Sequence, residues 1–342
     1  MKKLRNFSKF EIIFRCDAGD LPELGYGHLY RSILLANFLK KKFFLQPKKI
    51  LFIIKTNNKY SKSLNILKKY KFKIISLRPY IKDYSSDEIS FLQKFKANLI
   101  IIDRLGKLTK NFNHKLQDNF KKKIIIDDSS SERKFFDLSL NPLIQNVPKY
   151  QGANIGYKYH ILNQIKKSKP KDQNNIFIFF GGYDKKKISK RILKALNKIK
   201  LKFNIFVPES YKKLLIGIRL KHKIFFYKGK QYSVKLAGSK LAITAGGIGL
   251  FDAILNKKKI ICIPQYKHQK INAMKIVKKK AIKLLNFDDK KFNSKFTKFF
   301  LEIYDNNSYQ KKINAIHDQI INSKMLNKTL NLISKIYEKS KN

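Results

Sequence analysis

Short apolar runs recur along the chain, and most of them are continuous rather than alternating. Continuous runs of strand length are typical of strands buried on both faces of a parallel sheet. Segments with helical spacing lie between the runs, such as 28–43 and 186–200. This alternation predicts βαβ units. Ten strands are expected, at residues 10–17, 48–56, 71–77, 97–104, 122–129, 174–182, 202–208, 222–229, 240–247 and 258–265.

The expected strands fall into two groups, separated by the polar, lysine-rich stretch 163–175. This stretch contains a proline and is the best linker candidate in the chain. A length of 342 residues also suits two domains, each with its own core. We therefore expect an α/β protein with two Rossmann-like, doubly wound domains at 1–165 and 172–300, followed by a helical tail at 301–342. Two such domains facing a central cleft would bind a ligand between them.

Composition narrows the protein class. No apolar run approaches the roughly 18 residues that a membrane-spanning helix needs. The basic start of the chain is not followed by the apolar segment and cleavage site of a secretory leader. Cys16 and Cys262 both lie in apolar runs, which predicts buried thiols in a reducing compartment. The expected location is the cytoplasm.

The charge is strongly positive, with 76 basic and 23 acidic residues and a net charge of +53. Nucleic acid is the obvious partner for such a chain. However, only eight of the basic residues are arginine, the side chain that favours bidentate phosphate and base contacts, and the 68 lysines are spread throughout. We therefore expect a codon bias on an ordinary fold, and no nucleic acid as the main partner. The charge still suits nucleotide phosphates, and peripheral association with the inner membrane face stays open.

The stretch RCDAGDLPELGYGHLYRS joins the first predicted strand to the first predicted helix. The strand ends at Asp17, and Gly25 and Gly27 suit a tight turn. The helix then begins near His28, where unpaired N–H groups suit an anion and disfavour a charged imidazolium. A neutral His28 oriented by Asp17 or Asp20 would accept a proton near pH 7. The alternative is a histidine that only packs at the start of the helix.

A second glycine-rich turn lies within residues 240–277. A predicted strand leads into Gly246 and Gly247, and the following helix carries Asp252. Glycines let backbone N–H groups approach a pyrophosphate, and a carboxylate one turn into the helix can bind a ribose diol. A strand–turn–helix without a ligand is the alternative. The loop after the next strand contains Gln269 and Asn272.

Other candidates have weaker signals. Gly181 and Gly182 follow a strand, and Asp103, Asp127 and Asp128 lie at strand ends, where a solvated turn is equally expected. No histidine or cysteine cluster has metal-ligand spacing, and no G-x-S-x-G elbow occurs. The stretch GYGHLY lacks the third glycine of the dinucleotide fingerprint. We therefore expect neither a metal nor a cofactor.

Several motifs together resemble one family. FRCDAGDLPELGYGHLYRSILLANFL resembles the R-x-D…G-x-G-H-x-x-R signature of the UDP-2,4-diacetamido-2,4,6-trideoxy-β-L-altropyranose hydrolase family of pseudaminic acid biosynthesis. IIIDDSSSERKFFDLSLNP, GANIGYKYHIL and FIFFGGYDKKKISKRILKAL resemble later segments of the same family. AGGIGLFDAILNKKKIICIPQYKHQKINA resembles the nucleotide site shared with the glycosyltransferase that completes lipid II. The resemblance covers residues 10–280.

This resemblance implies a GT-B fold and metal-free, inverting cleavage at an anomeric carbon. His28 would activate water, and Asp252, which stands where the family has a glutamate, would bind the ribose. The catalytic candidates are His28 and Asp17. The substrate-binding candidates are Arg15, Gly25, Gly27, Arg31, Asp103, Asn141, Gly181, Gly182, Gly246, Gly247, Asp252, Gln269 and Asn272.

Three functions are compared. The leading hypothesis is a hydrolase that releases a modified amino sugar from UDP, in nonulosonic acid or surface polysaccharide synthesis. The alternative is a glycosyltransferase with the same donor site, since water and an acceptor alcohol need the same base. The third is a nucleotide-binding or polynucleotide-binding protein without catalysis. A nucleotide sugar is the expected partner, and a monomer the expected state.

Overall fold

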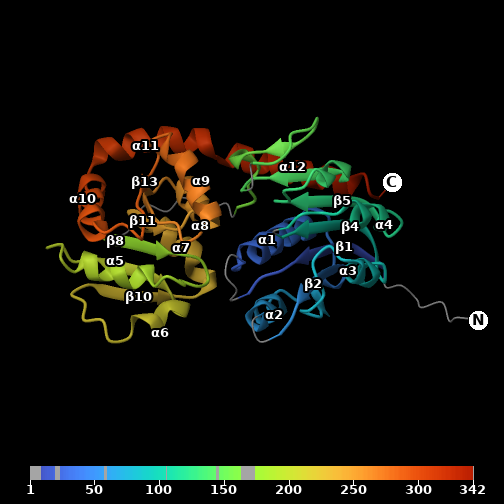
Figure 1. Ribbon diagram of the computed structural model, residues 1–342, viewed down its shortest axis with the longest axis horizontal. Helices are drawn as coiled ribbons and strands as arrows, with labels where there is room; N and C mark the ends of the chain where they lie inside the picture. The colour runs from blue at the N-terminus through green and yellow to red at the C-terminus, as the bar shows by residue number, and fades with distance from the viewer. Residues whose placement is uncertain are drawn as a thin grey trace, which may run out of the picture. The chain divides into compact units, whose positions relative to one another are not determined.

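The computed structural model describes residues 9–19, 24–57, 60–104, 106–143, 146–162 and 174–341. The chain divides into unit 1, Met1–Ile161 with Lys324–Asn342, and unit 2, Leu162–Ser323 (Figure 1). Most of the predicted linker, 163–173, lies outside the described residues. The residues predicted as a separate tail, 301–342, are distributed over both units.

Unit 1 contains a seven-stranded parallel sheet of order β3-β2-β1-β4-β5-β6-β7. Its strands are β1 (Lys9–Cys16), β2 (Ile50–Lys55), β3 (Lys73–Leu77), β4 (Lys96–Asp103), β5 (Phe120–Ile126), β6 (Leu138–Asn141) and β7 (Asn154–Ile155). Its helices are α1 (Gly27–Lys42), α2 (Ser61–Lys68), α3 (Ser86–Leu92), α4 (Lys110–Lys115) and α12 (Ser323–Glu338).

Unit 2 contains a six-stranded parallel sheet of order β10-β9-β8-β11-β12-β13. Its strands are β8 (Asn175–Phe179), β9 (Asn204–Pro208), β10 (Lys223–Tyr227), β11 (Leu241–Thr244), β12 (Lys259–Cys262) and β13 (Lys283–Leu284). Its helices are α5 (Ile188–Leu196), α6 (Lys212–Leu215), α7 (Tyr232–Ala237), α8 (Ile248–Leu255), α9 (Lys267–Val277), α10 (Phe292–Tyr304) and α11 (Asn307–Ile320). The predicted pair of doubly wound α/β units is confirmed.

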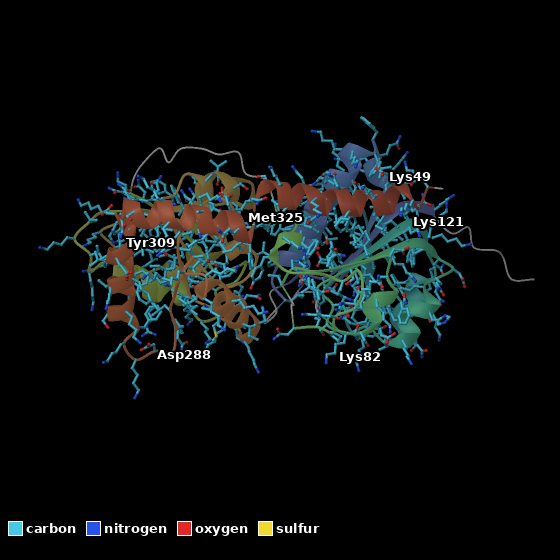
Figure 2. All side chains as sticks on the ribbon, turned by 90° about the horizontal axis from the view of Figure 1, so that it is seen from above. Lys49, Lys82, Lys121, Asp288, Tyr309 and Met325 are labelled. Carbon is cyan, nitrogen blue, oxygen red and sulfur yellow. The ribbon has the colours of Figure 1, made fainter. Side chains whose placement is uncertain are left out.

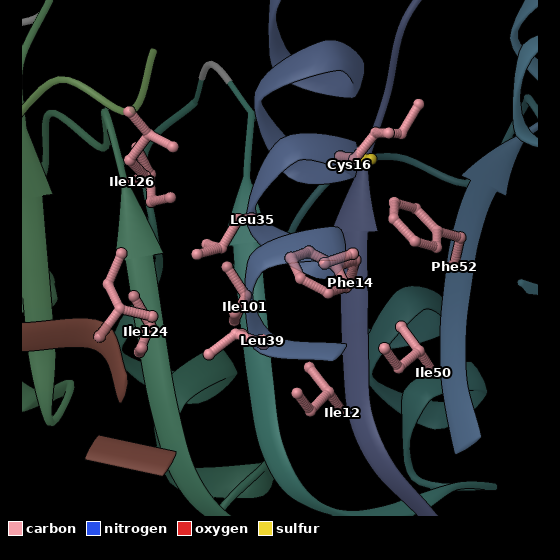
Figure 3. Packing of buried hydrophobic residues seen from close by; sticks show 14 of the residues in the cluster. Ile12, Phe14, Cys16, Leu35, Leu39, Ile50, Phe52, Ile101, Ile124 and Ile126 are labelled. Atoms are coloured by element: carbon pink, nitrogen blue, oxygen red, sulfur yellow. The ribbon is translucent and has the colours of Figure 1, made fainter. Parts of the chain in front are cut away.

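The central apolar strands are buried on both faces, whereas the edge strands β3 and β10 are partly exposed. In β1, Ile12 and Phe14 pack toward α1 with Leu35 and Leu39, whereas Ile13 faces the opposite layer (Figure 3). Phe14 stacks on Phe52 of β2 with ring centroids 4.9 Å apart. Each such side chain contributes about 1.5–3 kcal/mol when it is removed from water. The sequence does not predict β6, β7 and β13, which have two to four residues and lie in no continuous apolar run.

The last helix belongs to unit 1. Leu330, Ile333 and Tyr337 of α12 lie in the same hydrophobic cluster as β1 and α1. The Tyr337 hydroxyl donates a hydrogen bond to Glu11 Oε2 over 2.8 Å. An apolar stripe on this lysine-rich helix therefore covers one face of the first sheet.

The lysines are mostly outside these cores. Figure 2 shows their side chains projecting from both units, and Lys49, Lys82 and Lys121 are exposed. Both cysteines, Cys16 and Cys262, are buried free thiols, as predicted. Among the described helices, none combines the length and the apolar character needed to cross a membrane.

Candidate functional site

Two polar clusters lie at the carboxyl edge of the first sheet, one on each face. Strands β1 and β4 pair in parallel with Cys16 beside Asp103, so their ends meet at this edge. Because side chains alternate between the two faces of a strand, neighbouring residues point to different clusters. Asp103 contacts α1, whereas Arg15 and Arg104 contact Glu88 of α3.

The first cluster centres on His28, in the first turn of α1. His28 Nδ1 lies 2.7 Å from Asp103 Oδ1, and both side chains are buried. An ionised carboxylate can only accept at this distance, so Nδ1 carries the proton and donates it. No hydrogen bond to Nε2 is recorded among the described residues, and this nitrogen is left as the acceptor. The arrangement has the form of a histidine base held by a carboxylate.

Arg31 connects this pair to a third strand. Arg31 Nε donates to Asp103 Oδ2 and Nη1 donates to Asp127 Oδ2, each over 2.8 Å. Asp127 follows β5 and also accepts from the Leu143 backbone N–H at 2.9 Å. Burial by itself would raise the pKa of Asp103, but the positive charge of Arg31, together with His28, lowers that pKa to about 2. Asp103 is therefore a permanent anion at neutral pH.

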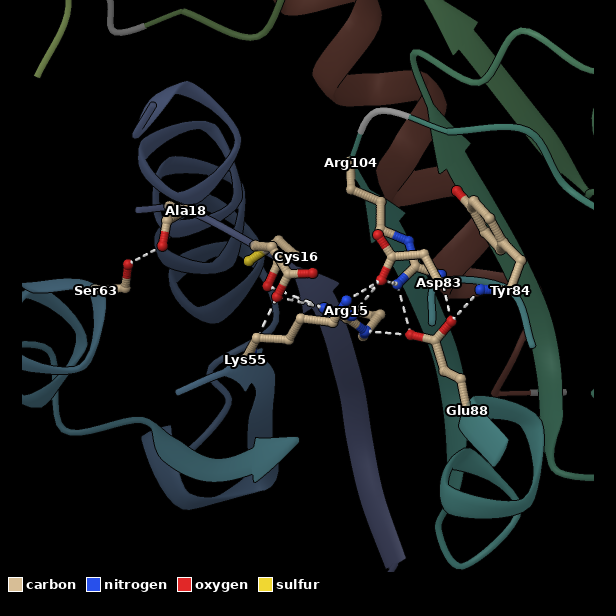
Figure 4. Close-up of polar contacts among 10 residues, drawn as sticks. Arg15, Cys16, Ala18, Lys55, Ser63, Asp83, Tyr84, Glu88 and Arg104 are labelled. Atoms are coloured by element: carbon tan, nitrogen blue, oxygen red, sulfur yellow. Dashed lines mark hydrogen bonds and ion pairs between the residues drawn. The ribbon is translucent and has the colours of Figure 1, made fainter. Parts of the chain in front are cut away.

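The second cluster is a buried network of ions on the α3 face (Figure 4). Arg15 Nε donates to Glu88 Oε1 and Arg104 Nη2 donates to Glu88 Oε2, each over 2.6 Å. Lys55 Nζ donates to Asp83 Oδ1 over 2.6 Å. Arg15, predicted as a substrate-binding residue, instead pairs with protein carboxylates and donates to the Cys16 carbonyl, and its side chain is inaccessible to solvent.

Asp17 belongs to this second cluster. Its Oδ1 accepts the Lys55 backbone N–H at 2.9 Å and pairs with Arg15 Nη1 at 2.7 Å. Burial opposes the charged form, but the charge of Arg15 outweighs it and lowers the pKa of Asp17. The expected contact between Asp17 and His28 is corrected, because Asp103 occupies that position and Arg15 holds Asp17 on the other face.

The loop glycines differ in their roles. Gly25 has a φ of +54° and its carbonyl accepts the Gly19 N–H at 3.0 Å, so this turn needs a residue that tolerates the left-handed region. Gly27 is the first residue of α1. Asp20, the other residue expected to orient His28, lies outside the described residues. Asn141 is buried at the end of β6 and donates to the Asp128 carbonyl over 2.7 Å, which braces the neighbouring strand end.

In unit 2, the glycine pair after β8 forms a turn tied to a tyrosine. Gly181 has a φ of +92°, and its carbonyl accepts the Tyr211 hydroxyl at 2.7 Å. The same hydroxyl accepts the Phe180 N–H at 2.9 Å. Gly182 directly follows this turn.

The turn between β11 and α8 meets the start of α9. A Cβ on Gly246 would overlap the backbone carbonyl of Gln269, whereas a Cβ on Gly247 would lie 3.7 Å from Gln269 Nε2. The structure thus brings the two predicted segments, 246–247 and 269, into contact. Gln269 Oε1 accepts the Gln265 N–H at 2.9 Å, and Asn272 is buried further along α9.

Asp252 is a buried carboxylate on α8, and it accepts the Tyr232 hydroxyl at Oδ2 over 2.9 Å. Burial raises the pKa of Asp252 to about 7, against the lowering effect of this hydrogen bond. A carboxylate with this pKa binds hydroxyl donors most strongly above neutral pH.

The described residues line cavities in both units. One, of about 230 Å³, lies at the start of α9 and is lined by Lys186, Pro264, Gln265, Tyr266, Lys267, Lys270, Leu284, Leu285, Asn286 and Asp288. The larger, of about 470 Å³, lies in unit 1 and is lined by Ser76, Arg78, Tyr80, Ile81, Asp87, Ser90, Phe91 and Lys94. Neither cavity is lined by a predicted site residue, so these two cavities do not identify the candidate site. The described residues also contain no group of three histidine, cysteine or acidic side chains suited to a metal ion.

Sequence reasoning missed the partners of the predicted residues. Glu88 pairs with both Arg15 and Arg104, and Asp83 pairs with Lys55. Tyr232, which holds Asp252, is a single aromatic residue in an unremarkable helix. Pairing across distant segments leaves no local pattern, and Glu88 stands beside Asp87 in the first turn of α3, where acidic residues are common without any buried partner.

The chain was compared with known proteins in sequence and in structure. No family model matches the chain. In sequence it is similar to the uncharacterized protein MJ1062 of Methanocaldococcus jannaschii, at 26% identity over 279 residues, which are 72% of this chain and 54% of that protein. The chain therefore spans about half the length of this relative.

Solved structures give a closer likeness in fold than in sequence. Acinetobacter baumannii MurG is similar with a TM-score of 0.66 and 12% identity, over 95% of this chain and 99% of that chain. Phytolacca americana UGT2, complexed with UDP-2fluoro-glucose and pterostilbene, gives 0.63 and 12%, over 97% and 99%. The spinosyn rhamnosyltransferase SpnG gives 0.60 and 12%, over 96% and 100%. The fold is that of the GT-B glycosyltransferases.

Proposed function

We propose that the chain is an enzyme that uses a nucleotide sugar, with His28 as its general base and Asp252 in its nucleotide site. The observation that carries this proposal is the His28–Asp103 pair, with Nδ1 held at 2.7 Å and Nε2 left to accept a proton. The GT-B fold supports the substrate class, since a similar structure, that of UGT2, was solved with UDP-2fluoro-glucose. UDP is therefore the first nucleotide to test.

The chemistry balances with groups of the chain itself. His28 Nε2 takes the proton of an attacking hydroxyl while its oxygen forms a bond to the anomeric carbon of the sugar. The bond from that carbon to the diphosphate oxygen breaks, and the nucleoside diphosphate leaves with the electron pair. Asp103, anionic at neutral pH, stabilises the imidazolium that forms. In unit 2, the Gly246–Gly247 turn offers backbone N–H groups of the kind that bind phosphates.

The attacking hydroxyl distinguishes two candidate reactions. Transfer to an acceptor alcohol is favoured, because the similar structures include glycosyltransferases. Hydrolysis is the second candidate, carried by the R-x-D…G-x-G-H-x-x-R pattern that ends at Arg31. Within that second candidate the substrate would be a UDP-linked modified amino sugar of pseudaminic acid or surface polysaccharide synthesis. The base has the same role in both reactions.

The test measures release of nucleoside diphosphate from a panel of UDP-sugars, first without and then with candidate acceptor alcohols. Release that starts only with an acceptor supports transfer, and immediate release supports hydrolysis. His28→Gln should lower either rate by about 10²–10⁴-fold, because the positioned base is lost. His114→Gln is the matched control, since His114 is exposed on α4.

The nucleotide affinity separates catalysis from binding. UDP should bind His28→Gln as tightly as it binds the natural chain, because Asp252 and Gly246 are unchanged. A variant that keeps the full rate of diphosphate release would overturn the role of His28. Failure of every nucleotide sugar to react, with nucleotide binding intact, would favour a binding protein without catalysis.

A further inference from the structure

Tyr232 packs against two phenylalanine rings. It meets Phe177 edge-on with centroids 5.3 Å apart and Phe179 edge-on at 5.0 Å. Both phenylalanines belong to β8, so the tyrosine is clamped against a central strand of the sheet. Aromatic pairs of this geometry hold a side chain in one rotamer. In this position the Tyr232 hydroxyl donates its hydrogen bond to Oδ2 of Asp252.

Asp252 has capacity for further donors. An ionised carboxylate offers about four lone-pair sites on its two oxygens. Among the described residues, Tyr232 is the one side chain recorded as donating to it, and it occupies a single site on Oδ2. A buried carboxylate with unused acceptor sites is unstable as an anion unless a ligand supplies donors.

We infer that Tyr232 is the positioning residue that makes unit 2 select ribonucleotides over deoxyribonucleotides. Its hydroxyl holds Oδ2 of Asp252, so that Oδ1 is aimed to accept hydrogen bonds from the 2′- and 3′-hydroxyls of a ribose. This inference rests on the proposed function, because it presumes that a nucleotide binds beside Asp252. It adds the substrate class: the donor is a ribonucleoside diphosphate sugar, and a thymidine diphosphate sugar is a poor substrate.

The pH at which Asp252 ionises can report on its contact with Tyr232, because the neighbouring tyrosines do not titrate near pH 7. Burial raises the pKa of Tyr232, Tyr227 and Tyr211, so all three stay neutral near pH 7. Helix α11 packs on α8 and brings Asp318 to Lys257, just beyond the end of α8. Loss of the Tyr232 hydroxyl removes the interaction that lowers the pKa of Asp252, so the ionised form should require a higher pH.

A matched control lies in the same aromatic cluster. Tyr227 stacks on Phe177 with centroids 5.3 Å apart and is 3% exposed. Its hydroxyl has no hydrogen-bond partner among the described residues. Tyr227→Phe therefore removes the same atom from the same core without altering Asp252, whereas Tyr232→Phe removes the donor.

The experiment is calorimetric titration of the full chain and both variants with UDP and with 2′,3′-dideoxy-UDP. The natural chain should prefer UDP. Tyr232→Phe should weaken UDP binding by about 10-fold, the effect of a lost hydrogen bond to a charged group. It should leave the dideoxy nucleotide unchanged, and Tyr227→Phe should leave both unchanged. The advantage of UDP over the dideoxy form should grow as pH rises through about 7, and at a higher pH in Tyr232→Phe.

The outcomes separate the inference from the function that it presumes. UDP binding that is unaffected in Tyr232→Phe, or that falls equally for both nucleotides with an unshifted pH profile, would overturn the positioning role and leave the nucleotide site standing. If UDP does not bind the natural chain, the nucleotide site and the inference fail together.

Discussion

His28 Nδ1 and Arg31 Nη2 both approach one carboxylate oxygen, Asp103 Oδ1, from the same face of α1. Residues three apart lie on one side of a helix, so a single turn delivers both side chains to the end of β4. The arginine keeps Asp103 ionised, and the ionised Asp103 keeps the proton on Nδ1. The tautomer of His28 is thus set by Asp103 and Arg31, two residues that the sequence predicts as substrate ligands but that the structure places in contact with the histidine.

Asp103→Asn tests this dependence directly. The amide can present its N–H₂ group to Nδ1 and stabilise the wrong tautomer, and it cannot stabilise the imidazolium. We expect the turnover rate to fall by about 10²–10⁴-fold, as for loss of base catalysis, with little change in UDP affinity. Ser32→Ala is the control, since its hydroxyl meets Asp103 Oδ2 only at 3.4 Å. A rate equal to that of the control would contradict the role of Asp103.

Arg31→Met should be costly for stability rather than for nucleotide binding. It leaves Asp103 and Asp127 as buried carboxylates without their common partner, a change that costs about 3–5 kcal/mol. Urea unfolding followed by circular dichroism measures the loss. The double variant with Asp127→Asn should recover part of it, because one uncompensated charge is removed. A single variant with full stability and weakened substrate binding would instead assign Arg31 to the sugar.

The free energy of unfolding at low pH should also depend on the ion pair between Asp103 and Arg31. The pKa of Asp103 is lowered to about 2 in the folded chain, against about 4 in an unfolded one. A lowered pKa contributes stability that is complete above about pH 4 and is lost as the pH falls toward 2. That contribution is about 2 kcal/mol for a shift of this size. The difference in unfolding free energy between the natural chain and Asp103→Asn should therefore narrow from pH 5 to pH 2, and a constant difference would exclude this pairing.

The fold could be predicted because its signal is local and repeated. Continuous apolar runs such as 97–104 identify buried parallel strands without any knowledge of their neighbours. The short strands β7 and β13 are set by pairing with longer strands, so their own residues carry no such signal. The sequence predicts a separate tail at 301–342, because the lysine-rich residues of α12 carry no local sign of the hydrogen bond between Tyr337 and Glu11 of the first strand.

The candidate site was predicted residue by residue, but not its pairings. The glycines and helix start around His28 were visible in one stretch of sequence. Its carboxylate partner lies 75 residues further along the chain, and strand alternation sends the nearer Asp17 to the opposite face. Which site residues contact one another depends on the order of the strands and on the face of the sheet to which each side chain points. A local sequence motif predicts neither.

Gly246 and Gly247 allow the nucleotide turn to be tested against simple packing. A Cβ at Gly246 would overlap the Gln269 carbonyl, so Gly246→Ala must displace the start of α9. We expect a loss of about 1–3 kcal/mol in unfolding free energy, the usual range for overpacking.

Gly247→Ala has room, with 3.7 Å to Gln269 Nε2, and should fold normally. If the Gly247 backbone approaches a diphosphate, this stable variant should still weaken UDP binding, as measured by calorimetry, because the new methyl group obstructs that approach. Normal UDP binding by Gly247→Ala would mean that the pair serves the turn alone, and the phosphate contacts would then have to come from elsewhere in unit 2.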